Sequence, residues 1–358
     1  MSFTPFNAPL LAPLLGDGEL TPYFSVRSDI EAMVRFEAAL AKAEAACGVI
    51  PEAAGQAICD ACGTFQPDLK LLGEGVARDG VAVPQLVKLL RDHVDEPHRR
   101  HVHLGATSQD LIDTSLVLRL AQVARILSAR LDTLDARLGD LDRRFGSEAL
   151  MGRTRMQAAI AMRAGDRIRT WRAPLKDHQA KLQALLPTLL RLQFGGAVGT
   201  LDKLGSNSAS HKGQEVSRLL AQELGLTAPP APWHTDRSAI IEFTHWLALV
   251  TGTLGKIGQD IVLMAQNGIG DIAVAGAGGS SAMPHKQNPV KGEALVTLAR
   301  FNAVLISGMH QAMVHEQERS GAAWTLEWML LPQMVIAAGA ATRTGAGLLG
   351  TISRIGSA

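Results

Sequence analysis

The sequence predicts an all-α protein, a bundle of very long helices with a small N-terminal helical domain. Alanine and leucine dominate the chain of 358 residues, and aromatic residues make up only 4% of it. Such a composition favours helices packed through aliphatic side chains over β-sandwiches. Several stretches have helical periodicity, whereas the alternation of apolar and polar residues typical of strands is nearly absent.

The first part of the chain indicates short helices. Residues 1–27 are rich in proline and glycine and are expected to be irregular. Ser28 can cap a helix over 28–47, and shorter helical pieces, broken by glycines and prolines, follow it. We therefore predict an N-terminal helical domain at 1–105 and a long-helix bundle domain at 106–358.

One long helix defines the predicted bundle. It begins near Ser108, with Asp110 in its first turn, and its length to Arg144 is about 50 Å. A helix that long needs packing partners along its whole length. Its apolar residues alternate in steps of three and four and form a heptad seam: Val117, Leu120, Ala124, Leu127, Leu131, Leu134, Leu138 and Leu141.

Four further long helices are expected downstream, and two glycine-rich loops separate them. The helices are predicted at 157–190, 236–267, 289–318 and 324–349, with Pro289 suited to a first helical turn. The loops lie at 195–200 and 268–279.

Composition and charge exclude several function classes. The formal net charge is +1 with no run of basic residues, so nucleic-acid binding is not implied. Polar residues interrupt every apolar run before it reaches membrane-spanning length. The first residues lack the pattern of a secretory signal. We therefore expect a cytoplasmic protein.

No metal site or disulfide framework is predicted. Cys47, Cys59 and Cys62 are too few for a framework, and no second pair completes the metal-like spacing of Cys59 and Cys62. The histidine-rich stretch 98–103 has no carboxylate at ligand spacing. A substrate contact is therefore the better interpretation of His103.

The segment 268–289 is the clearest candidate for chemistry. A glycine-rich loop of this length is often functional, and it delivers Ser280, Ser281, Lys286 and Asn288 immediately before a helix. Loop N–H groups, a helix N-terminus and a lysine suit an anion, and a serine beside positive charge can transfer a proton. An interhelical linker is the alternative reading. The lysine spacing is not that of a P-loop, and no strand precedes the glycines as a dinucleotide fold requires.

Four segments together resemble the fumarase/aspartase superfamily. S-S-A-M-P-H-K-Q-N-P at 280–289 is similar to its signature S-S-x-M-P-x-K-x-N. H-L-G-A-T-S-Q-D at 103–110 resembles its first conserved region, and G-R-T-R-M-Q at 152–157 its second, normally G-x-T-H-x-Q. G-G-A-V-G-T at 195–200 resembles its G-x-A-V-G-T turn. The matches occur in the order of the superfamily and cover nearly the whole chain.

Further segments resemble one branch, the 3-carboxy-cis,cis-muconate cycloisomerases. They are T-S-Q-D-L-I-D-T from Thr107, F-S-V-R and V-R-F-E-A-A-L-A-K-A-E-A near the N-terminus, and H-E-Q-E-R at 315–319 followed by Trp324 and E-W at 327–328. The resemblance implies closure of a small tricarboxylate, 3-carboxy-cis,cis-muconate, to 4-carboxymuconolactone, without a cofactor or metal. The chain is expected to lack the C-terminal helical domain that most members carry.

The resemblance also implies roles for site residues. Ser280 is expected to transfer a proton, Lys286 to stabilise developing charge, and Arg155 to hold substrate carboxylate. The residues expected to bind substrate are His103, Thr107, Ser108, Gln157, Ser281, Met283, Asn288, Glu293 and Arg319. Arg155 is expected to pair with Glu293.

Two other functions remain open. Adenylosuccinate lyases would share the loop, but Arg155 stands where they carry an active-site histidine, and 78–83 has no second one. A non-catalytic helical scaffold would share the heptads. Homotetramers are implied by the resemblance, with each active site built from several chains, and the heptad seam is expected to need neighbouring long helices.

Overall fold

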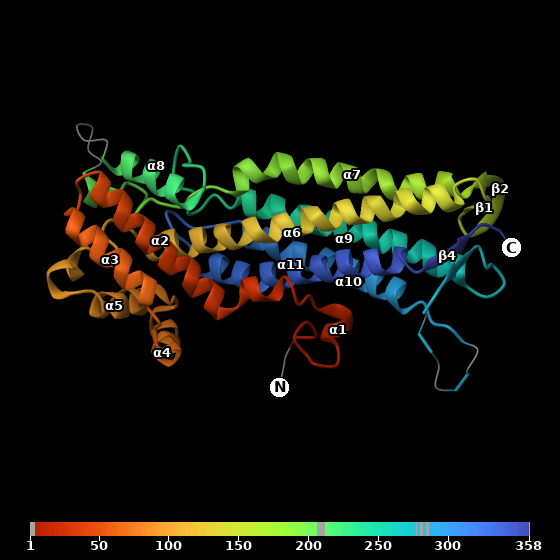
Figure 1. Cartoon of the computed structure of the whole chain (residues 1–358), viewed down its shortest axis with the longest axis horizontal. Helices are drawn as coiled ribbons and strands as arrows, with labels where there is room; N and C mark the ends of the chain where they lie inside the picture. Colours follow the sequence, from red (N-terminus) through yellow and green to blue (C-terminus); the bar gives the residue numbers. More distant parts are fainter. Residues whose placement is uncertain (1–3, 206–211, 277, 280–281, 284–285, 358) are drawn as a thin grey trace.

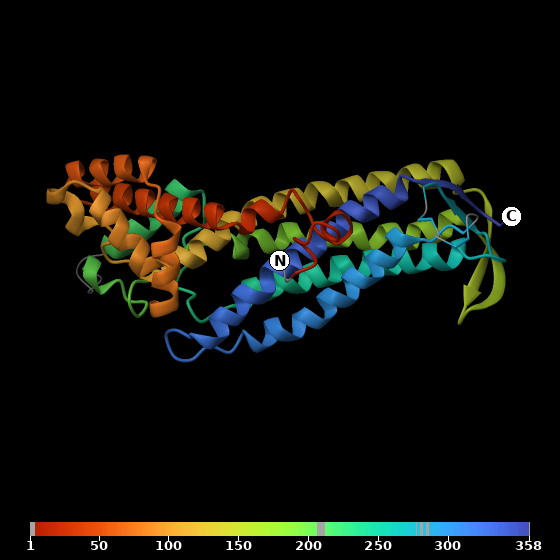
Figure 2. The ribbon, with the colours of Figure 1, turned by 90° about the horizontal axis from the view of Figure 1, so that it is seen from below.

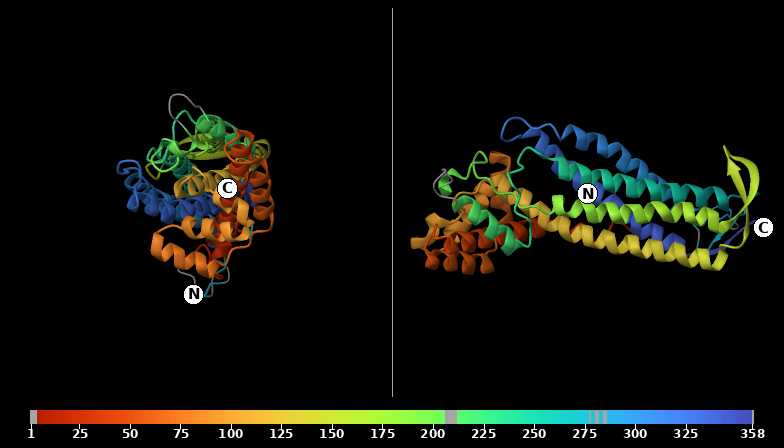
Figure 3. Two further views of the ribbon diagram at one scale, coloured as in Figure 1. Left: turned by 90° about the vertical axis from the view of Figure 1, so that its left-hand side faces the viewer. Right: turned by 90° about the horizontal axis from the view of Figure 1, so that it is seen from above.

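The computed structural model describes residues 4–205, 212–276, 278–279, 282–283 and 286–357. A bundle of long helices carries a lobe of short helices at one end (Figures 1 and 3). The bundle contains α6 (Ser108–Phe145), α7 (Ala164–Leu189), α9 (Ser238–Ala265), α10 (Val290–Gln311) and α11 (Ala322–Leu349). The predicted fold class is confirmed.

The heptad seam is the centre of the bundle. All eight seam residues of α6, from Val117 to Leu141, are at most 1% exposed. The seven from Leu120 to Leu141 belong to one core cluster with apolar residues of α7, α9 and α11. The long helices that the seam was expected to need are therefore present within the chain itself. α7 and α11 run alongside α6 and bury this stripe, and apolar residues of α9 complete the same core.

The lobe surrounds a second core. It contains α2 (Val26–Ala46), α3 (Glu52–Thr64), α4 (Leu69–Asp79), α5 (Val83–His93), the 3₁₀ turn η2 (Glu96–His101) and α8 (Lys212–Leu224). Its cluster also includes Leu111 and Leu118 of α6 and Leu192. The division at 105/106 stays a prediction, and the two cores do not follow it strictly, because α8 and Leu192 join the lobe core while Phe6 and Leu20 join the bundle core.

The start of the chain lies against both parts. Short α1 (Ala12–Leu15) and η1 (Thr21–Phe24) precede α2, and Phe6 and Leu20 belong to the bundle core. The N-cap of α2 is Ser25, three residues before the predicted Ser28, because the side chain of Ser25 accepts the Ser28 N–H at 3.2 Å.

The predicted helix at 157–190 was wrong over its first turns. Residues Gln157–Arg163 form strand β2, antiparallel to β1 (Ala149–Thr154), and α7 begins only at Ala164. The N–H of Arg163 donates to Asp166, which caps α7 at that point. β3 (Ile272–Val274) pairs with β4 (Ile352–Ile355). Short two-stranded pairs were missed because their few residues do not establish an alternating pattern.

α9 and α10 form the closest helix pair. A side chain at Gly255 would meet Ala299 at 2.5 Å, and one at Gly258 would meet the Gly292 carbonyl at 2.7 Å. α10 ends at Gln311, earlier than the predicted 318. Within the described residues α9 is the one helix long and apolar enough to span a membrane, but half of its most apolar window is buried in the bundle core. Its composition is that of a core helix.

Candidate functional site

The first conserved region lies at the N-terminus of α6, where the lobe joins the bundle. Thr107 is the N-cap residue and Ser108 the first helical residue, and both are half-buried. The first N–H groups of a helix of this length suit a carboxylate. The sequence placed the start of this helix correctly.

Asp110 holds this helix end to the turn at 195–200. Its carboxylate is fully buried and accepts the N–H groups of Thr107, Gly195 and Gly196 at 2.9–3.0 Å. It also lies 2.8 Å from Nε2 of His234. One carboxylate with this many donors fixes several segments relative to one another.

Arg319 lies on the other side of the same turn. Its Nε donates to the side-chain oxygen of Gln109 at 3.1 Å, and its Nη2 donates to the carbonyl of Ala197 at 3.1 Å. The structure therefore brings Arg319 to the end of α6 that carries Thr107 and Ser108. Both of these contacts are to other residues of the protein, so part of the guanidinium is already used within the chain.

A buried ionic cluster supports this end of the bundle. Arg237 on the first turn of α9 is bidentate to Asp113 of α6, at 2.7 and 3.0 Å, and to Glu327 of α11, at 2.6 and 3.0 Å. All three side chains are fully buried. Gln109 donates to Asp113 at 3.0 Å, so the cluster connects to Arg319. Burial, followed by the charge of Arg237, lowers the pKa of nearby His315.

His103 has a buried acidic partner that the sequence did not reveal. Its Nδ1 lies 2.6 Å from Oε1 of Glu37 on α2, and the Glu37 side chain is 1% exposed. The backbone of His103 is left-handed, with φ 63°.

The second region forms the hairpin at the far end of α6. Arg155 and Met156 make its two-residue turn, both with positive φ, which glycine and asparagine normally occupy. Arg155 and Gln157 are exposed, and Arg155 lines a groove of about 510 Å³ together with Asp271. Figure 2 shows the hairpin standing clear of the helices.

The third region lies at the same end. Ser280 and Ser281 fall outside the described residues. The segment is clasped at its base, where Gly278 and Asn288 exchange backbone hydrogen bonds of 2.9 and 2.7 Å. Asn288 also donates through its side chain to the Gly279 carbonyl at 3.2 Å. This base fixes where the segment leaves the bundle.

The other predicted residues of this region are accessible. Lys286, Asn288 and Glu293 line a groove of about 680 Å³, and the side chains of Met283, Lys286 and Glu293 are exposed. The described residues show no ion pair for Arg155, so the predicted pair with Glu293 is not formed within one chain.

The candidate residues thus form two groups at opposite ends of the bundle. His103, Thr107, Ser108 and Arg319 lie at the start of α6, and the hairpin and the 268–289 segment lie beyond its end. The 38 residues of α6 span about 55 Å. One chain does not bring the three regions together.

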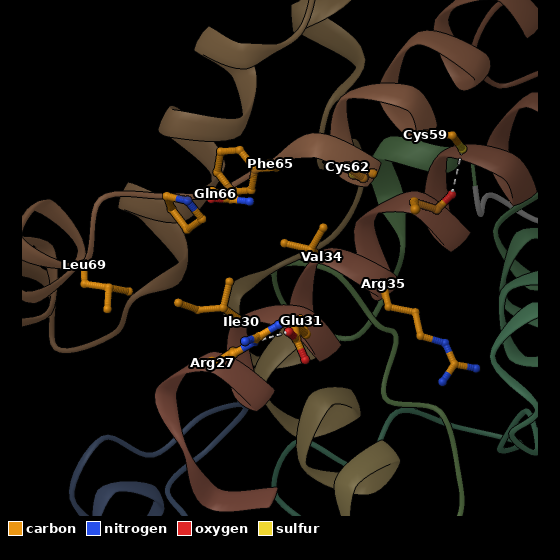
Figure 4. Close-up of a pocket in the computed structure, with 13 residues that line it drawn as sticks. Arg27, Ile30, Glu31, Val34, Arg35, Cys59, Cys62, Phe65, Gln66 and Leu69 are labelled. Atoms are coloured by element: carbon orange, nitrogen blue, oxygen red, sulfur yellow. Dashed lines mark hydrogen bonds and ion pairs between the residues drawn. The ribbon is translucent and has the colours of Figure 1, made fainter. Parts of the chain in front are cut away.

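A further groove of about 770 Å³ lies in the lobe, away from both groups. Figure 4 shows Ile30, Val34 and Phe65 around its apolar interior, with Arg27 paired to Glu31 at the rim. Burial raises the pKa of Cys62 to about 12, and the pKa of Cys59 is also raised by burial, so these thiols are poor nucleophiles. Within the described ranges no cluster of His, Cys, Asp or Glu is arranged to hold a metal ion.

Comparison with known proteins agrees with this geometry. Residues 18–304 match the lyase family. The chain belongs to this family, within the fumarase/aspartase superfamily. A Pseudomonas aeruginosa relative named 3-carboxy-cis,cis-muconate cycloisomerase is 42% identical, over 91% of this chain and 71% of the relative. A Bradyrhizobium diazoefficiens relative of the same name is 40% identical, over 92% and 73%.

Among solved structures, the 3-carboxy-cis,cis-muconate lactonizing enzyme from Pseudomonas putida is similar over the whole fold. The TM-score is 0.90 at 37% sequence identity, covering 97% of this chain and 77% of that one.

Proposed function

We propose that this lyase-family enzyme is a cycloisomerase that closes 3-carboxy-cis,cis-muconate to 4-carboxymuconolactone. The observation that carries the proposal is the sequence identity of 40–42% to two relatives of that name, over more than nine-tenths of the chain. It is supported by the anion-binding groups that the fold presents in each of the three regions.

The proposed reaction needs positioning, charge stabilisation and one proton. A substrate carboxylate oxygen adds to the conjugated double bond of the same molecule, so the reacting atoms are already linked. The C–O bond forms as the C=C π bond opens, and negative charge moves onto the carboxylate beside the new carbanion. Lys286 and Asn288 stabilise that charge. Ser280 then delivers the proton to carbon and is reprotonated from solvent.

The remaining carboxylates need their own partners. We assign them to the N-terminus of α6 with Thr107 and Ser108, to His103 and Arg319, and to Arg155 and Gln157 of the hairpin. Ser281 and Met283 are assigned to the walls of the site. Three carboxylates require several separated cationic or N–H donors, and these segments supply them.

We further propose that the active site is shared between chains of a homotetramer. The first region lies about 55 Å from the hairpin along α6. A complete site at either end of the bundle therefore needs a second chain to supply the region that lies at the opposite end of the first chain. The hairpin is exposed along nearly its whole second strand, as expected for an element that reaches a neighbour. An Arg155–Glu293 ion pair then forms between chains, where Glu293 orients the guanidinium.

The test is direct incubation of the protein with 3-carboxy-cis,cis-muconate. The diene absorption should disappear, and the lactone should appear by NMR in equal amount. Adenylosuccinate serves as the comparison substrate. If fumarate is released from adenylosuccinate and carboxymuconate is left intact, the enzyme is an elimination lyase and the proposal is wrong.

A further inference from the structure

Helix α2 carries two buried carboxylates to which the proposed function assigns no part. Glu37 and Glu44 are 1% and 0% exposed and lie two helical turns apart. The lobe core to which α2 contributes is apolar, with Phe36, Leu40 and Ile58 among its members. Burying a carboxylate among such side chains is costly unless the group has a partner.

The two carboxylates differ in their partners. Glu37 Oε1 contacts His103, whereas Glu37 Oε2 and both oxygens of Glu44 have no hydrogen-bond partner among the described residues. Burial, and then the nearby charge of Glu37, raise the pKa of Glu44 to about 9. Glu44 is therefore neutral at pH 7.

His103 depends on Glu37 for its orientation. It lies in the turn that leads to the N-cap of α6, with a left-handed backbone followed by Gly105 at φ 75°. The contact at 2.6 Å is the one hydrogen bond its imidazole makes within the described part of the chain. Nδ1–H donates to Glu37 and so fixes the direction of the ring. When the ring carries both protons, Nε2–H is the donor left for an anionic ligand.

We infer that Glu37 is a positioning residue for the reaction, fixing the direction of His103 so that Nε2–H of the protonated ring donates to a substrate carboxylate. This inference rests on the proposed function for the identity of the substrate. It assigns the N-terminal lobe a part in the active site through α2. Glu44 has no such part, although it is the same residue type on the same buried face.

That difference supplies a matched pair of variants. Glu37→Leu and Glu44→Leu each replace a buried carboxyl with an apolar side chain in an aliphatic core. Glu37→Leu should raise KM for 3-carboxymuconate about 10–100-fold, the range for a lost charge-assisted hydrogen bond, with kcat changed less than about threefold. Glu44→Leu should keep the parent's KM and kcat. Glu37→Gln, which retains an acceptor oxygen, should lie between the parent and Glu37→Leu.

A double-variant cycle separates positioning from general damage. If Glu37 acts through His103, Glu37→Leu combined with His103→Gln should be no worse than His103→Gln alone. If the effects of Glu37→Leu and His103→Gln on KM multiply in the double variant, the inference is overturned. Equal effects of Glu37→Leu and Glu44→Leu on KM would also overturn it.

A spectroscopic measurement tests the inference without substrate. In protein labelled with ¹⁵N-histidine, the His103 signals are those lost in His103→Gln. The Nδ1-protonated form should be present in the parent and in Glu44→Leu and should be lost in Glu37→Leu. An unchanged His103 spectrum in Glu37→Leu would overturn the inference. A parent that leaves carboxymuconate intact would instead overturn the proposed function, and the spectrum would still decide the role of Glu37.

Discussion

At the scale of single residues, the environment of a side chain decides its chemistry. Two glutamates on α2 illustrate this, because one has an imidazole partner and the other has none among the described residues. The residue type is the same, but the hydrogen-bond partners differ, and burial raises the pKa of Glu44 to about 9.

Glu44 should make stability depend on pH. Its pKa is raised from 4.5 to about 9 in the folded chain, so folding takes up a proton between these values. The free energy of unfolding should then fall as pH rises through that window, by about 1.4 kcal/mol per pH unit from this group. Denaturant unfolding at pH 6, 7 and 8 measures this. The free energy of unfolding of Glu44→Gln, relative to that of the parent, should rise by that amount for each pH unit. As a control, Glu31→Gln on the exposed face of α2 should show the same pH dependence of the free energy of unfolding as the parent. A Glu44→Gln curve parallel to the parent would contradict this account.

Ser280 is the residue-scale test of the chemistry. Ser280→Ala should reduce turnover of carboxymuconate at least ~100-fold, the lower end for loss of an acid or base group. KM should change little, because other groups hold the carboxylates. Steady-state kinetics by diene absorption measures both. Near-normal turnover would assign the proton transfer to another residue.

At the scale of elements, polar contacts decide how three long helices meet. Arg237 joins α9 to Asp113 of α6 and Glu327 of α11 in an interior with no exposed atoms. Apolar seams alone would permit the helices to slide, whereas paired charges accept one register.

Breaking this cluster should destabilise the bundle strongly. Asp113→Asn leaves Arg237 with one carboxylate in a buried site, which should cost about 3–5 kcal/mol of stability. The control is Asp135→Asn on the same helix, whose bond to Arg172 is about 30% exposed on each side and should be worth at most about 1 kcal/mol. Denaturant unfolding compares the two variants. Equal losses would show that the buried cluster adds nothing beyond a surface pair.

At the scale of the whole molecule, the length of α6 decides how a site can be made. Regions that lie close in sequence on either side of this helix lie far apart in space, and the seam that holds the helix is already covered within the chain. The proposed shared site rests on this geometry and on the exposed hairpin, and does not depend on the seam.

Mixing inactive variants tests the shared site. His103→Ala and Arg155→Ala should each be inactive, and refolded together at equal ratio they should regain roughly a quarter of the sites, because each residue then comes from a different chain of a closed oligomer. Activity after refolding measures the recovery, and mass spectrometry of size-tagged chains verifies mixed oligomers.

The control mixes two variants of the same region. His103→Ala with Ser108→Ala should regain no activity, since both residues come from one chain end. If His103→Ala and Arg155→Ala form mixed oligomers but regain no activity, the site does not combine these two regions from different chains.

The sequence by itself determined the helices and the segments that carry chemistry. The heptad spacing from Val117 to Leu141 depends only on local periodicity, so the sequence predicts this helix. The motifs around Lys286 and Thr107 depend only on the order of residues in the chain, so the sequence reveals them as well. The tertiary structure decided three things. It covered the seam with α7, α9 and α11 of the same chain, it turned residues 157–163 into a strand by pairing them with β1, and it placed Glu37 beside His103. Each of these depends on contacts between residues distant in sequence or on a competition between pairings that local propensity does not resolve. Two glutamates seven residues apart on the apolar face of α2 were the one visible sign of the buried pair, and only packing decided which of them meets His103.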